Sequence, residues 1–242
     1  LRDERFNNFI ETEKMSIDEF QSLQISDLAF RYKNEDESNG MIRSFGVGPI
    51  DFSIRTGEVI FIYGGNGSGK TTMINVILGI LKSDSGSISY NGIPLTSENY
   101  SNYRALFSVV FSDYHLFEEL YGFETIDEEE VDDYLKLFEL NDKVKFENLR
   151  FSSHKLSTGQ RKRLALINAI IIHKPILVLD EWAADQDPVF RKKFYTEIIP
   201  LLKSRNFSVI AITHDDAYYH VADKLYEMRS GQLSLLTPSE LI

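Results

Sequence analysis

Short apolar runs recur along the chain, and each has about the length of a buried β-strand. They occupy residues 59–63, 106–111, 176–179 and 207–213. Apolar residues at helical spacing fill the stretches between them, most clearly from Met73 to Leu81 and over residues 164–172. Because strands alternate with helices from residue 58 onward, we expect an α/β core with a mainly parallel sheet.

Weaker patterns flank this core. Residues 25–32 alternate apolar and polar positions as a half-buried strand does, and residues 50–54 give another strand signal. Turn sequences predict two hairpins, at Asn91-Gly92 after residues 83–90 and at Ser230-Gly231 within residues 224–236.

Residues 114–155 differ from the rest in charge, with twelve acidic and three basic residues between Glu118 and Glu147. The sequence Thr125-Ile126-Asp127-Glu128 predicts a capping box that opens a helix. One face of that helix is apolar and carries Val131, Tyr134, Leu135 and Phe138. We expect a small helical subdomain over about residues 113–160, with a solvated acidic face.

The first 22 residues are polar and mixed in charge, with scattered apolar side chains. We expect a linker to an upstream domain or a frayed terminus there, and the main domain over residues 23–242. The chain begins at Leu1 rather than Met, which favours a fragment or a processed product.

Composition narrows the class of protein. The 242 residues are 43% hydrophobic and 26% charged, as is ordinary for a globular domain. The net charge of -11 argues against nonspecific nucleic-acid binding, in which Lys and Arg neutralise phosphates. The absence of cysteine excludes disulfides and thiol chemistry. No apolar run approaches the roughly 20 residues that a membrane-spanning helix needs.

The strand at residues 59–63 runs directly into a glycine-rich loop: Gly64, Gly65, Asn66, Gly67, Ser68, Gly69, Lys70, Thr71 and Thr72. This is the phosphate-loop pattern G-x-x-x-x-G-K-[ST] in the strand–loop–helix context that it requires. The glycines let successive backbone N–H groups point inward, and the helix that opens at Gly69 adds its unpaired N–H groups. Lys70 supplies a charge for the β- and γ-phosphates, and the Thr71 hydroxyl can ligate Mg²⁺. We therefore predict that the chain binds a nucleoside triphosphate.

Other strand ends also carry polar side chains. Residues 176–179 lead into Asp180 and Glu181, and residues 207–213 lead into His214. Ligands of parallel sheets bind outside the carboxyl ends of the strands. Asp180 after an apolar strand needs a partner, and the Mg²⁺ of a bound nucleotide is the natural one. Glu181 is placed to orient or deprotonate the attacking water, and His214 to contact the γ-phosphate or hold that water.

A third motif lies upstream of Asp180. The sequence Leu156-Ser157-Thr158-Gly159-Gln160 opens a helix with Ser157 as N-cap and Gln160 at the capping-box position. Together with the glycine loop and the acidic strand end, it resembles the nucleotide-binding domain of ABC transporters over about residues 23–236. The resemblance implies hydrolysis of ATP with Mg²⁺. It also implies a P-loop NTPase core with an antiparallel β-subdomain and a small helical subdomain.

The same resemblance gives roles to further residues. Tyr32 is similar to the aromatic that stacks on adenine, Asp187 to the aspartate of the D-loop, and His214 to the switch histidine. Without that resemblance, Tyr32 would be better interpreted as a tyrosine that packs across strands.

The resemblance also implies partners. Two copies are expected to form a head-to-tail dimer, in which Ser157, Gly159 and Gln160 of one copy close over the ATP of the other. A transmembrane exporter domain is expected in the same polypeptide, with this domain on the cytoplasmic face of the membrane.

The chain departs from the commonest pattern of that family in two places. Ser112-Asp113 stand where a glutamine is usual, and either side chain could ligate the metal. Residues 182–188, WAADQDP, replace the usual proline-threonine-serine run. Both departures resemble the subgroup of half-transporters that export cyclic peptides and peptide siderophores.

Two other functions fit the sequence less well. ATPases of DNA repair and chromosome organisation have related domains, which are interrupted by long coiled coils. The stretch between Lys70 and Leu156 is too short for such an insertion, and the acidic charge also argues against this class. A nucleotide-gated dimerisation module without hydrolysis is disfavoured by Glu181 and His214. We therefore expect an ATP hydrolase that powers a membrane exporter.

Overall fold

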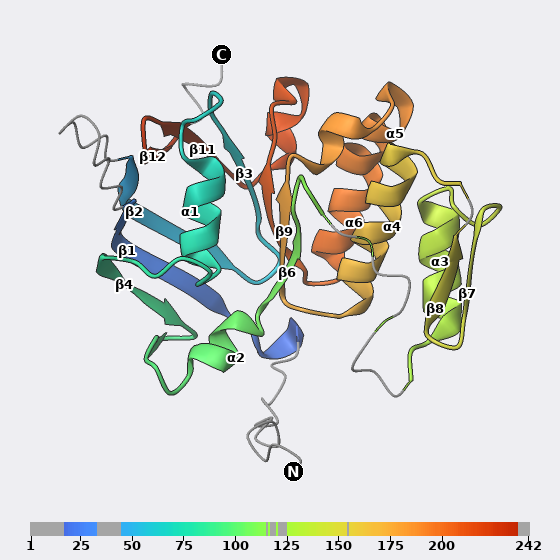
Figure 1. Cartoon of the computed structure of the whole chain (residues 1–242), viewed down its shortest axis with the longest axis horizontal. Coiled ribbons are helices and arrows are strands. Elements are labelled where there is room, and N and C mark those ends of the chain that lie inside the picture. Colours follow the sequence, from blue (N-terminus) through green and yellow to red (C-terminus); the bar gives the residue numbers. More distant parts are fainter. Residues whose placement is uncertain are drawn as a thin grey trace, which may run out of the picture.

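A six-stranded sheet forms the centre of the fold in the computed structural model (Figure 1), which describes residues 17–32, 45–114, 116, 120, 125–153 and 155–236. The strand order is β12-β11-β3-β10-β9-β6. The strands are β3 (Val59–Tyr63), β6 (Phe107–Val110), β9 (Ile176–Asp180), β10 (Ser208–Ile212), β11 (Lys224–Arg229) and β12 (Gln232–Leu235). All neighbours pair in parallel except β11 and β12, which form the predicted hairpin at Ser230-Gly231. The expected mainly parallel sheet is confirmed.

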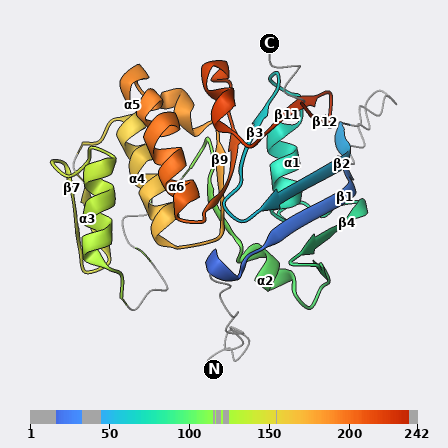
Figure 2. The ribbon, with the colours of Figure 1, turned by 180° about the vertical axis from the view of Figure 1, so that it is seen from behind.

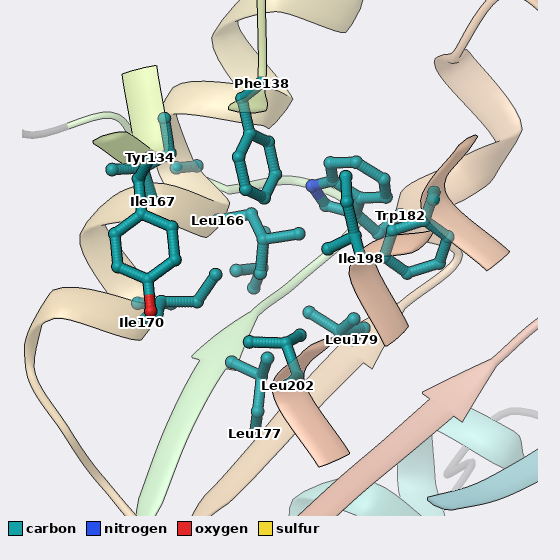
Figure 3. Packing of buried hydrophobic residues seen from close by; sticks show 14 of the residues in the cluster. Tyr134, Phe138, Leu166, Ile167, Ile170, Leu177, Leu179, Trp182, Ile198 and Leu202 are labelled. Atoms are coloured by element: carbon teal, nitrogen blue, oxygen red, sulfur yellow. The ribbon is translucent and has the colours of Figure 1, made fainter. Parts of the chain in front are cut away.

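Alternate residues of the central strands belong to separate hydrophobic cores. In β3, Val59 and Phe61 pack into one core, whereas Ile60 and Ile62 pack into the other. The first core lies against the helices α4 (Thr158–Ile171) and α6 (Ile199–Ser204), and Figure 3 shows it from close by. The second core lies against α1 (Lys70–Ile77) and a second sheet. Because both faces of the sheet are covered, β3 consists only of apolar and aromatic residues, as is typical of buried parallel strands.

The second sheet is antiparallel and has the order β2-β1-β4-β5. It consists of β1 (Ser22–Arg31), β2 (Gly46–Arg55), β4 (Ser85–Tyr90) and β5 (Ile93–Pro94). The predicted turn at Asn91-Gly92 joins β4 to β5, and both turn residues have positive φ. Phe20, which precedes β1, is buried in the second core. Of the expected extension over residues 1–22, residues 1–16 lie outside the described residues.

The opposite end of the molecule holds α3 (Glu128–Leu137) and a two-stranded sheet of β7 (Val144–Glu147) and β8 (Arg150–Ser153), as Figures 1 and 2 show. The four apolar residues expected on one face of α3 are buried. Parts of the expected helical subdomain, residues 115, 117–119, 121–124 and 154, lie outside the described residues. The hairpin of β7 and β8 was not predicted, although Phe146 and Phe151 pack their rings 4.6 Å apart across it.

Short elements complete the described chain. They are α2 (Tyr100–Arg104), α5 (Pro188–Lys193), a π-helix (Phe194–Ile198), and 3-10 helices at Ile17–Glu19, Trp182–Asp185 and Asp216–Val221. Among the described residues, no helix has both the length and the apolarity that a membrane crossing requires.

Two helix boundaries differ from the prediction. The apolar pattern extends α1 to Leu81, but the helix ends at Ile77 because Gly79 adopts a left-handed conformation with φ 68°. The cap of α3 is Asp127, not Thr125, and its carboxylate accepts hydrogen bonds from the N–H groups of Glu129 and Glu130. A carboxylate there also favours the positive end of the helix dipole, so Asp127 outcompetes a threonine two residues earlier.

Candidate functional site

The phosphate loop lies between β3 and α1. Gly69 is the N-cap of α1, with φ 110° and no side-chain capping bond. A Cβ at Gly69 would lie 2.8 Å from a side-chain carbon of Val47 and 3.0 Å from one of Met228. Both the conformation and the space therefore require glycine, and the first N–H groups of α1 remain without side-chain partners at the loop.

Lys70 follows at once and is only 6% exposed. Its ammonium donates to the main-chain oxygens of Gly64, at 2.7 Å, and Gly65, at 3.2 Å. It also lies 3.8 Å from Oε1 of Glu181. The loop thus holds a cation at its centre, next to the first turn of α1.

Asp180 and Thr71 form a second polar pair. The Thr71 hydroxyl donates to Oδ2 of Asp180 at 3.4 Å, and Asp180 is 2% exposed. Burial and the neighbouring Glu181 raise the pKa of the Asp180 carboxyl above its usual value. A hydroxyl and a buried carboxylate are ligands that Mg²⁺ prefers, so these residues fit that metal. Ser112 is exposed, and no described contact joins it to either residue.

Glu181 and His214 lie beside this pair. Glu181 has a left-handed backbone with φ 50° and ψ 35°, and its Oε1 lies 3.4 Å from Nε2 of His214. The two side chains are 38% and 49% exposed, so both can meet a ligand or water. The ends of β3, β9 and β10 therefore bring together Lys70, Asp180, Glu181 and His214, the arrangement expected from the sequence.

A pocket of about 340 Å³ opens over the loop and is lined by Phe45, Asn66, Gly67, Ser68, Gly69, Lys70, Thr71, Thr72 and Glu181. The Ser68 hydroxyl is buried and has no hydrogen-bond partner among the described residues, which suits a polar ligand. Tyr32 does not line the pocket but stacks on Phe45, with ring centroids 6.3 Å apart and planes at 26°. Phe45 was not predicted, because it precedes β2 outside any motif of fixed spacing.

The N-terminus of α4 is built differently. Ser157 is its N-cap, and Ser157 and Gln160 form the predicted capping box. Gln186 donates from Nε2 to the main-chain oxygen of Gly159 at 3.2 Å. Asp187 is the N-cap of α5. None of these five residues lines the pocket over the loop.

Two buried basic side chains connect α4 to the segment after β9, residues 181–187. Arg163 donates to Oε1 of Gln186 at 2.9 Å and to Oδ2 of Asp187 at 2.7 Å, and it lies over the ring of Phe190. The neighbouring Lys162 is 2% exposed and pairs with Asp185 at 2.7 Å. Both belong to the basic run Arg161-Lys162-Arg163 after Gln160, and nothing in the sequence showed that they are buried.

Arg191 and Tyr195 contact Asp215, the residue after His214. Arg191 donates to the main-chain oxygens of Ala184 and Gln186, both at 3.1 Å, and pairs with Asp215 at 3.3 Å. The Tyr195 hydroxyl donates to Asp215 at 2.8 Å. No sequence spacing pointed to these contacts, since they join separate elements.

The loop on α1, the acidic end of β9 and the parallel sheet define a P-loop nucleoside triphosphatase. A family model described as ABC transporter matches residues 47–184, which is more than half of the chain. The chain therefore belongs to the ABC transporter family, as an ATP-binding ATPase domain.

Individual proteins similar to this chain also support its place in the ABC transporter family. The chain is 42% identical over 214 residues to the ATP-binding protein SyrD of Pseudomonas syringae pv. syringae, covering 87% of this chain but only 37% of SyrD. It is 30% identical to the energy-coupling factor transporter ATP-binding protein EcfA1 of Streptococcus pneumoniae, covering 90% of this chain and 81% of EcfA1. Among solved structures, cbiO1 of Clostridium perfringens matches with a TM-score of 0.70 and 26% identity, covering 92% and 90% of the two chains.

Proposed function

We propose that this domain binds ATP with Mg²⁺ and hydrolyses it to drive a membrane exporter. The observation that carries the proposal is the cluster at the strand ends, where Glu181 lies within 4 Å of both Lys70 and His214. Asp180 and Thr71 adjoin this cluster as a pair that fits a metal.

Each side chain has a chemical role in this proposal. Lys70 and the open N–H groups of α1 hold the β- and γ-phosphates. Thr71 and Asp180 would hold Mg²⁺, whose positive charge would offset the negative charge of the phosphates. Glu181 takes the proton of the attacking water, and His214 positions that water against the γ-phosphate. Ser112 or Asp113 would add a further metal ligand, as the resemblance implies.

The adenine ring is proposed to stack on Tyr32. Phe45 lies at the phosphate end of the pocket, because a Cβ at Gly69 would lie 3.4 Å from its ring. Tyr32 stacks on Phe45 and is 37% exposed. The base of a nucleotide held by Lys70 would stack on this exposed ring.

The second site element comes from another copy of the chain. Ser157, Gly159 and Gln160 lie outside the pocket over the loop, which supports a head-to-tail dimer in which they close over the partner's triphosphate. The Asp187 segment would lie at the same interface. The Ser157 hydroxyl and the N–H groups of the first turn of α4 would supply the donors.

The partner that this dimer drives is proposed to be a transmembrane domain, which would place the chain at the cytoplasmic face of a membrane. The solved structure of cbiO1 is described as part of the ABC transporter complex cbiONQ, and EcfA1 belongs to a transporter, which supports this. Export of cyclic peptides or peptide siderophores rests on the Ser112-Asp113 and 182–188 sequences. Fusion to the transmembrane domain in one polypeptide is proposed on the same resemblance.

Glu181→Gln tests the role of the cluster. The amide cannot accept the proton, so ATP turnover should fall by roughly 10²–10⁴. Binding should persist, and ATP should trap a dimer visible by light scattering. A variant that loses affinity for ATP as strongly as it loses turnover would contradict the assignment of Glu181 as the base.

A further inference from the structure

Lys162 is a buried lysine to which the proposed mechanism gives no role. It lies in the first turns of α4, and its ammonium pairs with Oδ2 of Asp185 at 2.7 Å. The same ammonium donates to the main-chain oxygen of Glu181 at 3.3 Å. The main-chain oxygen of Lys162 accepts from Nε1 of Trp182 at 2.8 Å. All three contacts fall on residues 181–185, directly after β9.

That segment begins with an unfavourable backbone. Glu181 is a non-glycine residue in the left-handed region, a conformation that costs about 1–3 kcal/mol and persists only when its surroundings impose it. The Glu181 N–H donates to the main-chain oxygen of Ile212, which holds the residue from the β10 side. Lys162 holds its carbonyl from the α4 side.

Stability alone does not explain a lysine at this position. Burying an ammonium is costly, and its partner Asp185 is 47% exposed, so the attraction is weakened by solvent. An apolar side chain of similar volume would suit the surrounding core at least as well. What an apolar side chain could not provide is a donor to the carbonyl of Glu181.

We propose that Lys162 is a positioning residue, which fixes the main chain of Glu181 so that its carboxylate faces His214 and Lys70. This inference rests on the proposed function, because it takes Glu181 as the general base. Burial and Glu181 raise the pKa of Asp180, and the Lys162 ammonium is among the groups that lower it.

The test compares kcat, KM and ATP affinity of Lys162→Met and Lys162→Arg in the full 242-residue chain. Removing a residue that positions a catalytic base typically lowers activity by about 10–100-fold, so Lys162→Met should lower kcat by that factor. KM and the Kd for ATP should stay within about threefold, because the pocket over the loop is untouched. Lys162→Arg keeps a donor and should recover part of kcat. A folded Lys162→Met with unchanged kcat would overturn the proposal.

Lys224→Met is the matched control. Lys224 is a partly buried lysine that pairs with Glu58 at 2.9 Å and donates to the main-chain oxygen of Ser53, away from the cluster. It should lose stability but keep kcat. Trp182, the single tryptophan of the chain, gives a spectroscopic readout. Its emission should shift to longer wavelength in Lys162→Met and not in Lys224→Met, since the segment after β9 loosens only in the former.

A double-mutant cycle separates this inference from the proposed function. If Lys162 acts through Glu181, adding Lys162→Met to Glu181→Gln should change turnover by less than about twofold. Full turnover in Glu181→Gln itself would refute the proposed role of Glu181. Slow turnover in Glu181→Gln, with the full Lys162→Met effect on top, would refute only the role of Lys162.

A further variant keeps the test decisive if Lys162→Met does not fold. Asp185→Asn removes the charge that holds the ammonium and leaves the lysine in place. It should lower kcat by a smaller factor at unchanged KM. An unchanged kcat in that folded variant would equally overturn the proposal.

Discussion

Helices α1 and α4 both have a glycine at their N-terminus, but the two N-termini are built in opposite ways. Gly69 is the N-cap of α1, whereas Gly159 lies in the first turn of α4. α1 begins at Gly69 with no side-chain cap, so its first N–H groups are open to a ligand. α4 begins at Ser157 with a complete capping box, in which Ser157 Oγ accepts from the N–H of Gln160 at 3.2 Å. The N-terminus of α1 can therefore bind an anion within one chain. At the N-terminus of α4, the capping box already provides hydrogen-bond partners for some of the N–H groups.

This difference predicts an order of events. A triphosphate should bind first at α1, where no internal bond has to be replaced. At α4, the N–H groups of Thr158 and Gly159 and the hydroxyl hydrogen of Ser157 are not used by the capping box, and within the described part of the chain they remain as donors. These are enough for a supporting contact from a second copy, but they make a poor site on their own. The following predictions test this comparison from the largest expected effect to the smallest.

The strongest test makes the α4 end repel an anion. Gly159→Asp in the Glu181→Gln background should abolish the ATP-dependent dimer, since like charges brought together at an interface cost several kcal/mol. Binding of ATP to the monomer should remain. Light scattering with and without ATP gives the result.

This test needs its own control, because a Cβ at Gly159 would lie 2.8 Å from the main-chain oxygen of Asp185. Gly159→Ala carries that crowding without the charge. A dimer that is lost in both variants would point to displacement of the segment after β9. A dimer that persists in Gly159→Asp would show that the α4 end does not face the phosphates.

Lys70→Ala removes the cation at the α1 end. Truncating one partner of a close charge pair costs roughly 2–4 kcal/mol, so ATP affinity should fall by about 30- to 1,000-fold. Calorimetry on the monomer measures this, with Lys224→Ala as the control that keeps affinity. If Lys70→Ala binds ATP like the parent, the phosphates do not occupy the loop.

Tyr32→Ala tests the aromatic surface beside the α1 end. Stacking of a base on an aromatic ring contributes about 1–3 kcal/mol, so affinity for ATP should fall by about 5- to 150-fold, and Tyr32→Trp should retain it. Phe45→Ala is the informative comparison. If Phe45→Ala weakens binding and Tyr32→Ala does not, the base lies on Phe45 instead.

Ser157→Ala is expected to have the smallest effect. It removes the N-cap of α4, which should lower the free energy of unfolding by about 1 kcal/mol. ATP affinity of the monomer should be unchanged, because Ser157 does not line the pocket over the loop. Urea unfolding and calorimetry report the two quantities separately. A clear loss of monomer affinity would mean that the two helix ends share one site.

The elements that could be predicted from the sequence are those whose chemistry is local. The phosphate loop, the capping box at Ser157 and the acidic end of β9 each depend on residues a few positions apart, and the structure contains all three. The β7 and β8 hairpin was missed because its strands have four residues each. Its turn, at Asn148 and Leu149 with positive φ, lacks the glycine that usually marks such turns.

Contacts between distant elements could not be predicted. Lys162 and Arg191 are ordinary basic residues in the sequence, and the same composition would fit a solvated helix face. Their partners Glu181 and Asp215 lie on other elements, and only the packing of α4 and α5 against the sheet brings them within reach. For the same reason, the places of Ser112, Ser157 and Asp187 around a bound nucleotide stay predictions.

Because Glu181 has a left-handed backbone, selection for stability and selection for turnover favour different residues at position 181. Glycine would relieve the backbone strain, and asparagine would tolerate it better than most residues, but neither supplies a carboxylate. A library of this chain selected only for survival after heating should therefore accumulate glycine or asparagine at position 181 and lose turnover as it gains stability. The acid can persist there only under continued selection for the reaction itself.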